Sequence, residues 1–284
     1  MSVFIVGSRG YIAQHASRRL RDDGLNVIEL SSRPQGDQIE FNLLAPHAFD
    51  YSRIQAGDLV LFAAGVSSPD VCHNQPDEAR AINVTGTGLA IESALGRGSR
   101  VVFFSSDTVY GYAEDERREN AAVNPAGAYA DMKCEVEARF AGVPDVKALR
   151  LSYVFSRADK FTTYLRMCAQ ERRSAEIFHP IWRRAIYLND LLDLLRLVCT
   201  SWDHAPAGII NVCGPELLSR VDIANLYRDT VAPSLRINVV QPPPGFFQAR
   251  PRGVNMSSRL FERVLGRSPK SLREAMRIEF GKEN

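Results

Sequence analysis

The sequence predicts an α/β fold: a doubly wound parallel sheet, with a smaller α/β lobe in the C-terminal half. An apolar run at residues 2–7 leads directly into a glycine-rich turn and a helical pattern that continues through Leu20. Short apolar segments then alternate with helical patterns as far as Leu151. Repeated strand–helix units of this kind form parallel sheets with helices on both faces.

Each element is expected from its local pattern. Apolar segments bounded by polar or glycine turns predict strands at residues 2–7, 26–30, 58–62, 101–104 and 146–151. Helical patterns cover residues 79–95 and a segment that starts at Pro125 and contains Tyr129, after a polar excursion at 114–124. Because ligands bind at the carboxyl ends of parallel strands, the residues that follow these strands are the candidates for a site.

The turn after the first strand has the spacing of a dinucleotide-binding loop. It reads Gly7-Ser-Arg-Gly10-Tyr-Ile-Ala13 and sits between a strand and a helix. Gly7 permits the tight turn, Gly10 lets the backbone approach a pyrophosphate, and Ala13 is small enough for helix–sheet packing. Tyr11 and Ile12 begin the helix beside the cofactor. The alternative, a purely structural turn, explains this context less well.

The third expected strand also ends in small residues, Ala63, Ala64 and Gly65. Small side chains at this place let a dinucleotide lie against the backbone. Together with the glycine turn, they predict a Rossmann-type site that uses a nicotinamide cofactor.

The end of the second strand predicts the type of cofactor. Enzymes that use NAD place an acidic residue there for the ribose 2′-hydroxyl, whereas this segment reads Leu30-Ser31-Ser32-Arg33. Glu29 alternates to the other face of the strand. Arg33, with Arg9 from the glycine turn, suits a 2′-phosphate and favours NADP(H). The alternative is that both arginines are solvated surface residues.

Ser106, Tyr129 and Lys133 are the candidate catalytic residues. Tyr129 and Lys133 are four residues apart and would share one helix face, and Ser106 follows the 101–104 strand. A tyrosine hydroxyl has a pKa of about 10. A neighbouring lysine ammonium is expected to lower that pKa, which would allow proton transfer to or from a carbonyl/alcohol pair. The alternative for the Tyr/Lys pair alone is an ordinary amphipathic helix.

In the C-terminal half the regular alternation of strands and helices ends, and the pattern predicts a smaller lobe over the carboxyl edge of the sheet. Helices are expected at 161–170, 190–199 and 222–227, and strands at 185–188, 209–213 and 236–240. We assign residues 1–155 to the cofactor domain and 156–284 to the substrate lobe, with 182–213 returning to the sheet.

Four arginines of this half are candidates to bind an anionic substrate. They are Arg183, Arg184, Arg250 and Arg252, the last two in a proline-rich loop at 241–252. The alternative for this loop is a stiff surface connector.

Composition narrows the functional class. The net charge of +2 is too balanced for a nucleic-acid surface, and no apolar run approaches a membrane span of about 20 residues. The chain begins directly in a strand, so we expect no signal peptide. Its five scattered cysteines fit reduced thiols in a cytoplasmic protein, and no Cys/His cluster has metal-ligand spacing.

Taken together, the motifs resemble the extended short-chain dehydrogenase/reductases that modify sugar nucleotides, almost end to end. Besides the glycine turn and the residues at 63–65, 106, 129 and 133, the resemblance rests on Asn83-Val-x-Gly86-Thr87, Ser105-Ser106-Asp107-Thr-Val-Tyr-Gly111, Leu149-Arg150 and Arg183-x6-Asp190. The tail Arg250-Pro-x-x-x-Asn-Met-Ser-Ser-Arg-Leu260 is similar to that of dTDP-4-dehydrorhamnose reductases. Four residues depart from the pattern: Ala13 for glycine, Asn42 for aspartate, and Met256-Ser257 for Leu-Asp.

The resemblance implies a role for each site residue. Tyr129 would be the proton donor/acceptor, Lys133 its pKa modulator and a ribose ligand, and Ser106 a ligand of the substrate carbonyl. Arg183 would lie near a substrate diphosphate, with Ser67, Asp107 and Arg250 also on the substrate. Asn42, Leu43, Ser105, Tyr153 and Val154 would contact the cofactor. Family members often dimerise through two helices, here 79–95 and 129–140.

The function expected from these implications is NADPH-dependent reduction of a keto group, at C4, of a deoxysugar nucleotide. The resemblance implies that dehydratases of this family have Thr-Asp-Glu at the positions where this chain has Ser106-Asp107-Thr108. Because the glutamate is missing here, the acid/base group needed to eliminate water is missing as well. An epimerase is an alternative, although Arg33 argues against the tightly held NAD of that group. A second alternative is a regulatory NADP-binding protein, but such proteins commonly lack the Tyr/Lys pair.

Overall fold

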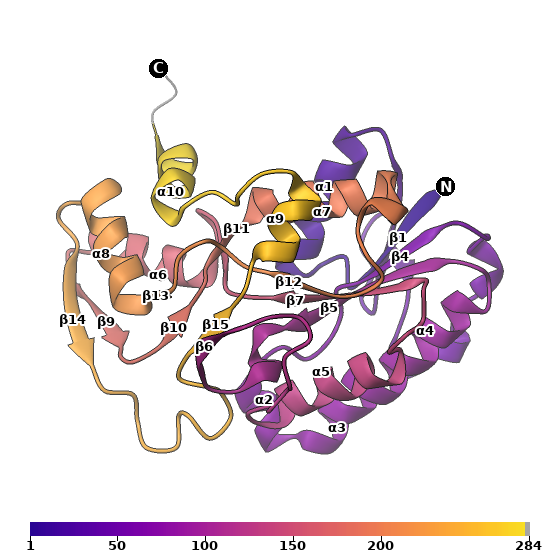
Figure 1. Ribbon diagram of the computed structural model, residues 1–284, viewed down its shortest axis with the longest axis horizontal. Helices are drawn as coiled ribbons and strands as arrows, with labels where there is room; N and C mark the ends of the chain where they lie inside the picture. Colours follow the sequence, from indigo (N-terminus) through magenta and orange to yellow (C-terminus); the bar gives the residue numbers. More distant parts are fainter. Residues whose placement is uncertain (282–284) are drawn as a thin grey trace.

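A seven-stranded parallel sheet forms the centre of the protein in the computed structural model, which describes residues 1–281 (Figure 1). Its strand order is β12-β7-β5-β4-β1-β2-β3, and every neighbouring pair is parallel. The strands are β1 (Ser2–Val6), β2 (Asn26–Ser31), β3 (Ile39–Glu40), β4 (Leu59–Phe62), β5 (Arg100–Ser106), β7 (Val146–Leu151) and β12 (Gly208–Val212). The order reverses between β1 and β4, where a doubly wound sheet forms its ligand crevice. The predicted α/β class is confirmed.

Helices cover both faces of this sheet (Figure 1). One face carries α1 (Tyr11–Asp22), α7 (Leu188–Thr200) and α9 (Arg259–Leu265), and the other carries α4 (Thr87–Leu95) and α5 (Ala128–Arg139). The strands are buried on both faces, so their sequences are continuous apolar runs rather than alternating ones. That property made them recognisable from the sequence.

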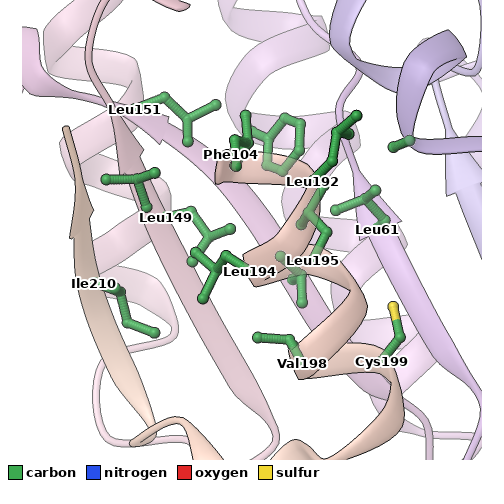
Figure 2. Packing of buried hydrophobic residues seen from close by; sticks show 14 of the residues in the cluster. Leu61, Phe104, Leu149, Leu151, Leu192, Leu194, Leu195, Val198, Cys199 and Ile210 are labelled. Carbon is green, nitrogen blue, oxygen red and sulfur yellow. The ribbon is translucent and has the colours of Figure 1, made fainter. Parts of the chain in front are cut away.

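The leucine-rich face of α7 fills the core between this helix and the sheet. Figure 2 shows Leu194 beside Leu149 of β7, with Leu195 next to it along α7 and Ile210 of β12 at the edge of the same cluster. These four side chains are at most 2% exposed. Because α7 and β12 pack here, residues from beyond position 182 complete the sheet that the N-terminal half begins.

The helix expected at 79–95 is built from three pieces. After α2 (Pro69–Asn74), the chain forms α3 (Pro76–Arg80), a π-helical segment Ala81–Gly86, and then α4. Asn83 in the π-helical segment donates to the carbonyl of Val66 at 2.9 Å and accepts from its backbone N–H at 2.8 Å. This irregular segment therefore holds the loop after β4, where a site residue was expected.

The C-terminal lobe surrounds a small parallel pair, β9 (Ser174–Phe178) and β14 (Arg236–Val240). Helices α6 (Lys160–Gln170), α8 (Arg220–Thr230) and α10 (Leu272–Phe280) pack on this pair and around it, with a core of their own (Figure 1). The antiparallel pair β10 (Trp182–Arg183) and β13 (Leu218–Ser219) lies beside it. β9, α9 and α10 had not been expected.

Short parallel pairs connect the lobe to the sheet. β8 (Val154–Phe155) pairs with β11 (Ile186–Tyr187), and β6 (Ala113–Arg117) pairs with β15 (Val254–Met256). Single-turn 3₁₀ helices lie at Pro46–Ala48, Tyr51–Arg53, Asp107–Tyr110 and Trp202–His204. No helix within residues 1–281 is both long enough and apolar enough to cross a bilayer.

Three sequence-based element predictions were wrong in detail. The 114–124 segment is not entirely irregular, because its first residues form β6 by pairing with a distant strand. The helix that carries Tyr129 begins at Ala128 rather than Pro125, since Gly127 has a positive φ of 88° that ends the preceding loop. The strand expected at 185–188 is only β11, because Leu188 already belongs to α7.

Replacing Leu194 by alanine should remove part of the α7 core. The side chain is fully buried, so we expect the free energy of unfolding to fall by about 2–5 kcal/mol in urea denaturation. Leu217→Ala is the matched control, since Leu217 is 41% exposed, and it should change stability by no more than about 0.5 kcal/mol. Equal losses in the two variants would contradict this packing.

Candidate active site

A cavity of about 470 Å³ opens at the carboxyl ends of β1, β2 and β4. Eleven residues expected at the cofactor line it: Gly7, Arg9, Gly10, Ser31, Ser32, Arg33, Asn42, Leu43, Ala63, Ala64 and Gly65. Val6, Phe41, Val66 and Ile82 line it as well and had not been expected. The structure thus brings the glycine turn, the end of the second strand and the small residues after β4 around one space.

The glycine turn is closely packed against the end of β4. Gly7 has a φ of 82°, and the backbone N–H groups of Gly7 and Ser8 both donate to the carbonyl of Leu30. A Cβ at position 7 would lie 2.6 Å from the Cα of Ala64. The turn therefore requires glycine for both its backbone conformation and its neighbour.

Two arginines lie at the β2 side of this cavity. Nη1 of Arg9 donates to the carbonyl oxygen of Arg33 at 3.0 Å, which brings the two side chains to the same edge. Glu29 points away from it, because its carboxylate accepts from Ser17 and pairs with Arg21 of α1. The cavity edge is therefore cationic and carries the hydroxyls of Ser31 and Ser32.

A second cavity, of about 480 Å³, lies between the sheet and the C-terminal lobe. Ten of the predicted site residues line it: Ile12, Ser67, Ser105, Ser106, Asp107, Tyr129, Tyr153, Val154, Arg183 and Arg250. The lobe adds residues that sequence reasoning missed: Phe161, Ile181, Leu218, Arg220, Ile223 and Phe246. Ser106 and Tyr129 therefore face the same space as two of the four candidate arginines.

Lys133 is buried beneath this cavity rather than lining it. Its side chain is 6% exposed, and Nζ donates to the carbonyl of Phe104 in β5 at 2.7 Å. Nζ also lies 4.5 Å from the ring centroid of Phe103 and 5.7 Å from that of Tyr129. Burial lowers the pKa of Lys133 to about 8, although Glu137 acts in the opposite direction.

The pKa of Tyr129 is raised, opposite to the direction expected from the neighbouring lysine. Burial is the largest cause, and the negative charge of Asp107 adds to it, while a hydrogen bond with Ser106 acts in the opposite direction. In this site, desolvation outweighs any stabilisation of the phenolate by Lys133. Tyr129 is therefore neutral near neutral pH, as an ordinary tyrosine is, and its raised pKa makes it a weaker acid than a free tyrosine.

Asp107 is fixed at the base of the cavity. Its Oδ2 accepts from Ser152 at 2.9 Å and lies 3.3 Å from Nε of Arg183, and its Oδ1 accepts from Ser106 at 3.4 Å. Burial raises the pKa of Asp107, and the Arg183 charge opposes that rise. Ser106 also accepts from the hydroxyl of Thr108 at 3.0 Å, so its position is determined on both sides.

A buried ion pair holds α5, the helix of Tyr129 and Lys133, against the sheet. Glu137 of α5 accepts from Nη2 of Arg150 in β7 at 2.6 Å and from Ser105 in β5 at 2.5 Å. Arg150 also donates to the hydroxyl of Tyr110 at 2.6 Å. Both charged side chains are almost fully buried, so each depends on the other for compensation.

Four of the residues named from the sequence lie outside the lining of both cavities. Tyr11 contacts Ser156 through its hydroxyl, and Lys133 is buried as described. Arg184 binds Asn255 and the carbonyl of Pro215, and Arg252 lies over the ring of Phe247. Within residues 1–281, no group of three or more His, Cys, Asp or Glu side chains is placed to hold a metal, and the five cysteines are free.

The model of one protein family, described as the RmlD substrate binding domain, matches residues 1–280. The chain belongs to this family. The resemblance to dTDP-4-dehydrorhamnose reductase-like members of the extended short-chain dehydrogenase/reductases is thereby confirmed.

Individual relatives of this RmlD-family chain are distant. It is 22% identical to methionine adenosyltransferase 2 subunit beta of Bos taurus over 89% of this chain and 79% of that protein. It is 29% identical to a dTDP-4-dehydrorhamnose reductase of Sinorhizobium fredii over 55% of this chain and 52% of the reductase. The solved structure of MoeE5 in complex with UDP-glucose and NAD superposes with a TM-score of 0.82 at 22% identity, covering 99% of this chain and 97% of MoeE5. At that identity, the structural likeness shows the fold.

Removing the carboxylate of Glu137 should destabilise this RmlD-family protein strongly. Glu137→Leu would leave Arg150 buried without its partner, and we expect a loss of about 3–5 kcal/mol in the free energy of unfolding. The double variant Glu137→Leu/Arg150→Met removes both charges and should recover most of that loss, as measured by chemical denaturation. Additive losses in the double variant would contradict the coupling.

Proposed function

We propose that the protein is an NADPH-dependent reductase that converts a keto group of a deoxysugar nucleotide, at C4, into an alcohol. The observation that carries this proposal is the second cavity, where Ser106 and Tyr129 share one lining with Arg183 and Arg250. A proton donor, a hydroxyl ligand and a cationic wall in one space suit a carbonyl on an anionic substrate. In this proposal, residues 1–155 bind the cofactor and 156–284 provide most of the substrate lobe.

Tyr129 has the protonation state that reduction requires. Its hydroxyl is protonated near neutral pH, as that of an ordinary tyrosine is, and this proton would pass to the carbonyl oxygen. The hydroxyl of Ser106 would hold the same oxygen, while Thr108 and Asp107 keep Ser106 in place. Lys133, which is buried beneath the cavity, would act on Tyr129 through the positive charge of its Nζ, which lies near the Tyr129 ring.

The first cavity fits the dinucleotide. Its glycine turn brings backbone N–H groups to the start of α1, and its edge carries Arg9, Arg33, Ser31 and Ser32 without an acidic lining residue among those described. Two guanidiniums and two hydroxyls suit a 2′-phosphate, which favours NADPH over NADH. When bound, the cofactor supplies the hydride. MoeE5, which has this fold, is described with NAD, so the preference has to be measured.

The sugar-nucleotide class is supported by the relatives and by charge. A matched relative is named dTDP-4-dehydrorhamnose reductase, and MoeE5 is described with UDP-glucose. Position 108 is threonine and Asp107 is paired with Arg183, so the lining described within residues 1–281 offers no acid besides Asp107 for the elimination step of a dehydratase.

A non-catalytic, regulatory role is the second candidate, because a relative that matches 89% of the chain is named as a subunit of another enzyme, methionine adenosyltransferase 2 subunit beta. A regulatory protein would bind NADPH without oxidising it in the presence of any keto-sugar nucleotide.

Tyr129→Phe should abolish turnover without abolishing cofactor binding. Loss of the proton donor is expected to lower kcat by roughly 10²–10⁴-fold in NADPH oxidation with a panel of 4-keto sugar nucleotides. Tyr112→Phe is the matched control and should keep near-full activity, because Tyr112 is 50% exposed and lines neither the cofactor cavity nor the second cavity. Near-full turnover by folded Tyr129→Phe would refute the assignment.

Arg33→Ala should shift the cofactor preference toward NADH. Losing a charge-assisted contact of about 1.5–3 kcal/mol corresponds to a roughly 10–100-fold weaker affinity for NADPH, with NADH affinity little changed. Arg53→Ala, an exposed arginine outside the cavity lining, is the control. Titration of cofactor fluorescence measures both affinities, and an unchanged NADPH/NADH ratio in Arg33→Ala would exclude the phosphate contact.

A further inference from the structure

A third cavity, of about 270 Å³, shares a wall with the proposed substrate cavity. Phe161 and Arg220 line both spaces, and the third cavity adds Lys160, Tyr164, Glu176 and Phe178. The guanidinium carbon of Arg220 lies 5.3 Å from the ring centroid of Phe161, so the two side chains form this wall together. Arg220 is therefore accessible to a ligand from either side.

The other two cavity arginines are already engaged by protein groups. Arg183 uses Nε for Asp107 at 3.3 Å, Nη1 for the carbonyl of Trp182 at 2.7 Å, and Nη2 for the carbonyl of Pro251 at 3.2 Å. Arg250 pairs with Asp70 through Nη2 and stacks on Phe246 at 4.3 Å. These contacts engage three of the five N–H donors of the Arg183 guanidinium.

Arg220 differs because its guanidinium makes no hydrogen bond or ion pair with any residue in 1–281, although its backbone N–H donates to Ile181. The carboxylate of Asp159 acts on it from a distance, but its oxygens already accept from Tyr153 and from the backbone N–H groups of Ser156, Phe161 and Thr162. Surrounding protein lowers the pKa of Arg220, and the like charges of Arg183 and Arg250 act in the same direction. An oxyanion beside Arg220 would relieve that repulsion and would supply its missing partner.

We propose that Arg220, rather than Arg183, is the principal ligand for the phosphate groups of the substrate, which would lie where the two cavities meet. This inference rests on the proposed function, because it assumes a sugar nucleotide. It assigns Arg183 a positioning role, holding Asp107 beneath Ser106. Sequence reasoning had assigned the phosphate contact to Arg183 and had not singled out Arg220.

The test is calorimetric binding of UDP, dTDP and inorganic pyrophosphate to the NADPH-loaded full-length protein. Arg220→Gln should weaken each probe by roughly 10–100-fold, since it removes a charge-assisted contact. Arg220→Lys should recover part of that loss by restoring the charge without the planar fork. Arg183→Lys should weaken binding by less than about threefold. Arg228→Gln, an exposed arginine later in α8, is the matched control and should bind as wild type.

Several outcomes would overturn the inference. Unchanged binding of all three probes by Arg220→Gln would do so, as would a loss on Arg183→Lys that exceeds the loss on Arg220→Gln. The third such outcome is that Arg220→Gln weakens the binding of UDP-glucuronate but not of UDP. In that case the arginine would bind the carboxylate of the sugar rather than the phosphates. Thermal unfolding of each variant confirms that it is folded.

The inference and the proposed function can fail separately. Arg220-dependent binding of pyrophosphate without turnover of any keto-sugar nucleotide would retain the anion site and reject the reductase. If Arg220→Gln turns over a keto-sugar nucleotide with unchanged kcat and KM, the reductase proposal would stand and the proposed anion site at Arg220 would be rejected.

Discussion

The buried ion pair between Glu137 and Arg150 is the interaction on which the candidate site depends most. It fixes α5 against the ends of β5 and β7, and Ser105 joins it from the strand that carries Ser106. Tyr129 and Lys133 lie on the same helix, about two turns and one turn before Glu137. Their placement relative to Ser106 is therefore set by a charge pair that lies outside the reacting centre.

The electrostatics of the substrate cavity favour an anionic substrate and a neutral tyrosine. Its lining includes three arginines and one aspartate, and that aspartate is paired with Arg183. The same aspartate and the burial of the phenol keep Tyr129 protonated.

The sheet and the outline of the site could be predicted because both follow from short-range patterns. Strands buried on both faces are continuous apolar runs, and the parallel topology places the glycine turn, Ala64 and Ser106 at one edge. The direction of the Tyr129 pKa shift could not be predicted from the four-residue spacing. It depends on burial and on Asp107, which reaches the tyrosine only through the fold. Lys133 likewise turns to the carbonyl of Phe104, a partner that no sequence pattern indicates. The proposed role of Arg220 could not be predicted from the sequence, because a single arginine at the start of a helix belongs to no recognisable motif. The proposal depends on its position between two cavities, which only the fold defines.

The fate of the hydride tests the central claim most directly. NADPH that carries deuterium at the transferable C4 position would be incubated with 4-keto sugar nucleotides, and the product would be analysed by mass spectrometry and NMR. A carbonyl reductase predicts one deuterium at the former carbonyl carbon for each NADPH consumed. A product isomerised without net consumption of NADPH, or NADPH bound tightly but never oxidised with any substrate of the panel, would contradict it.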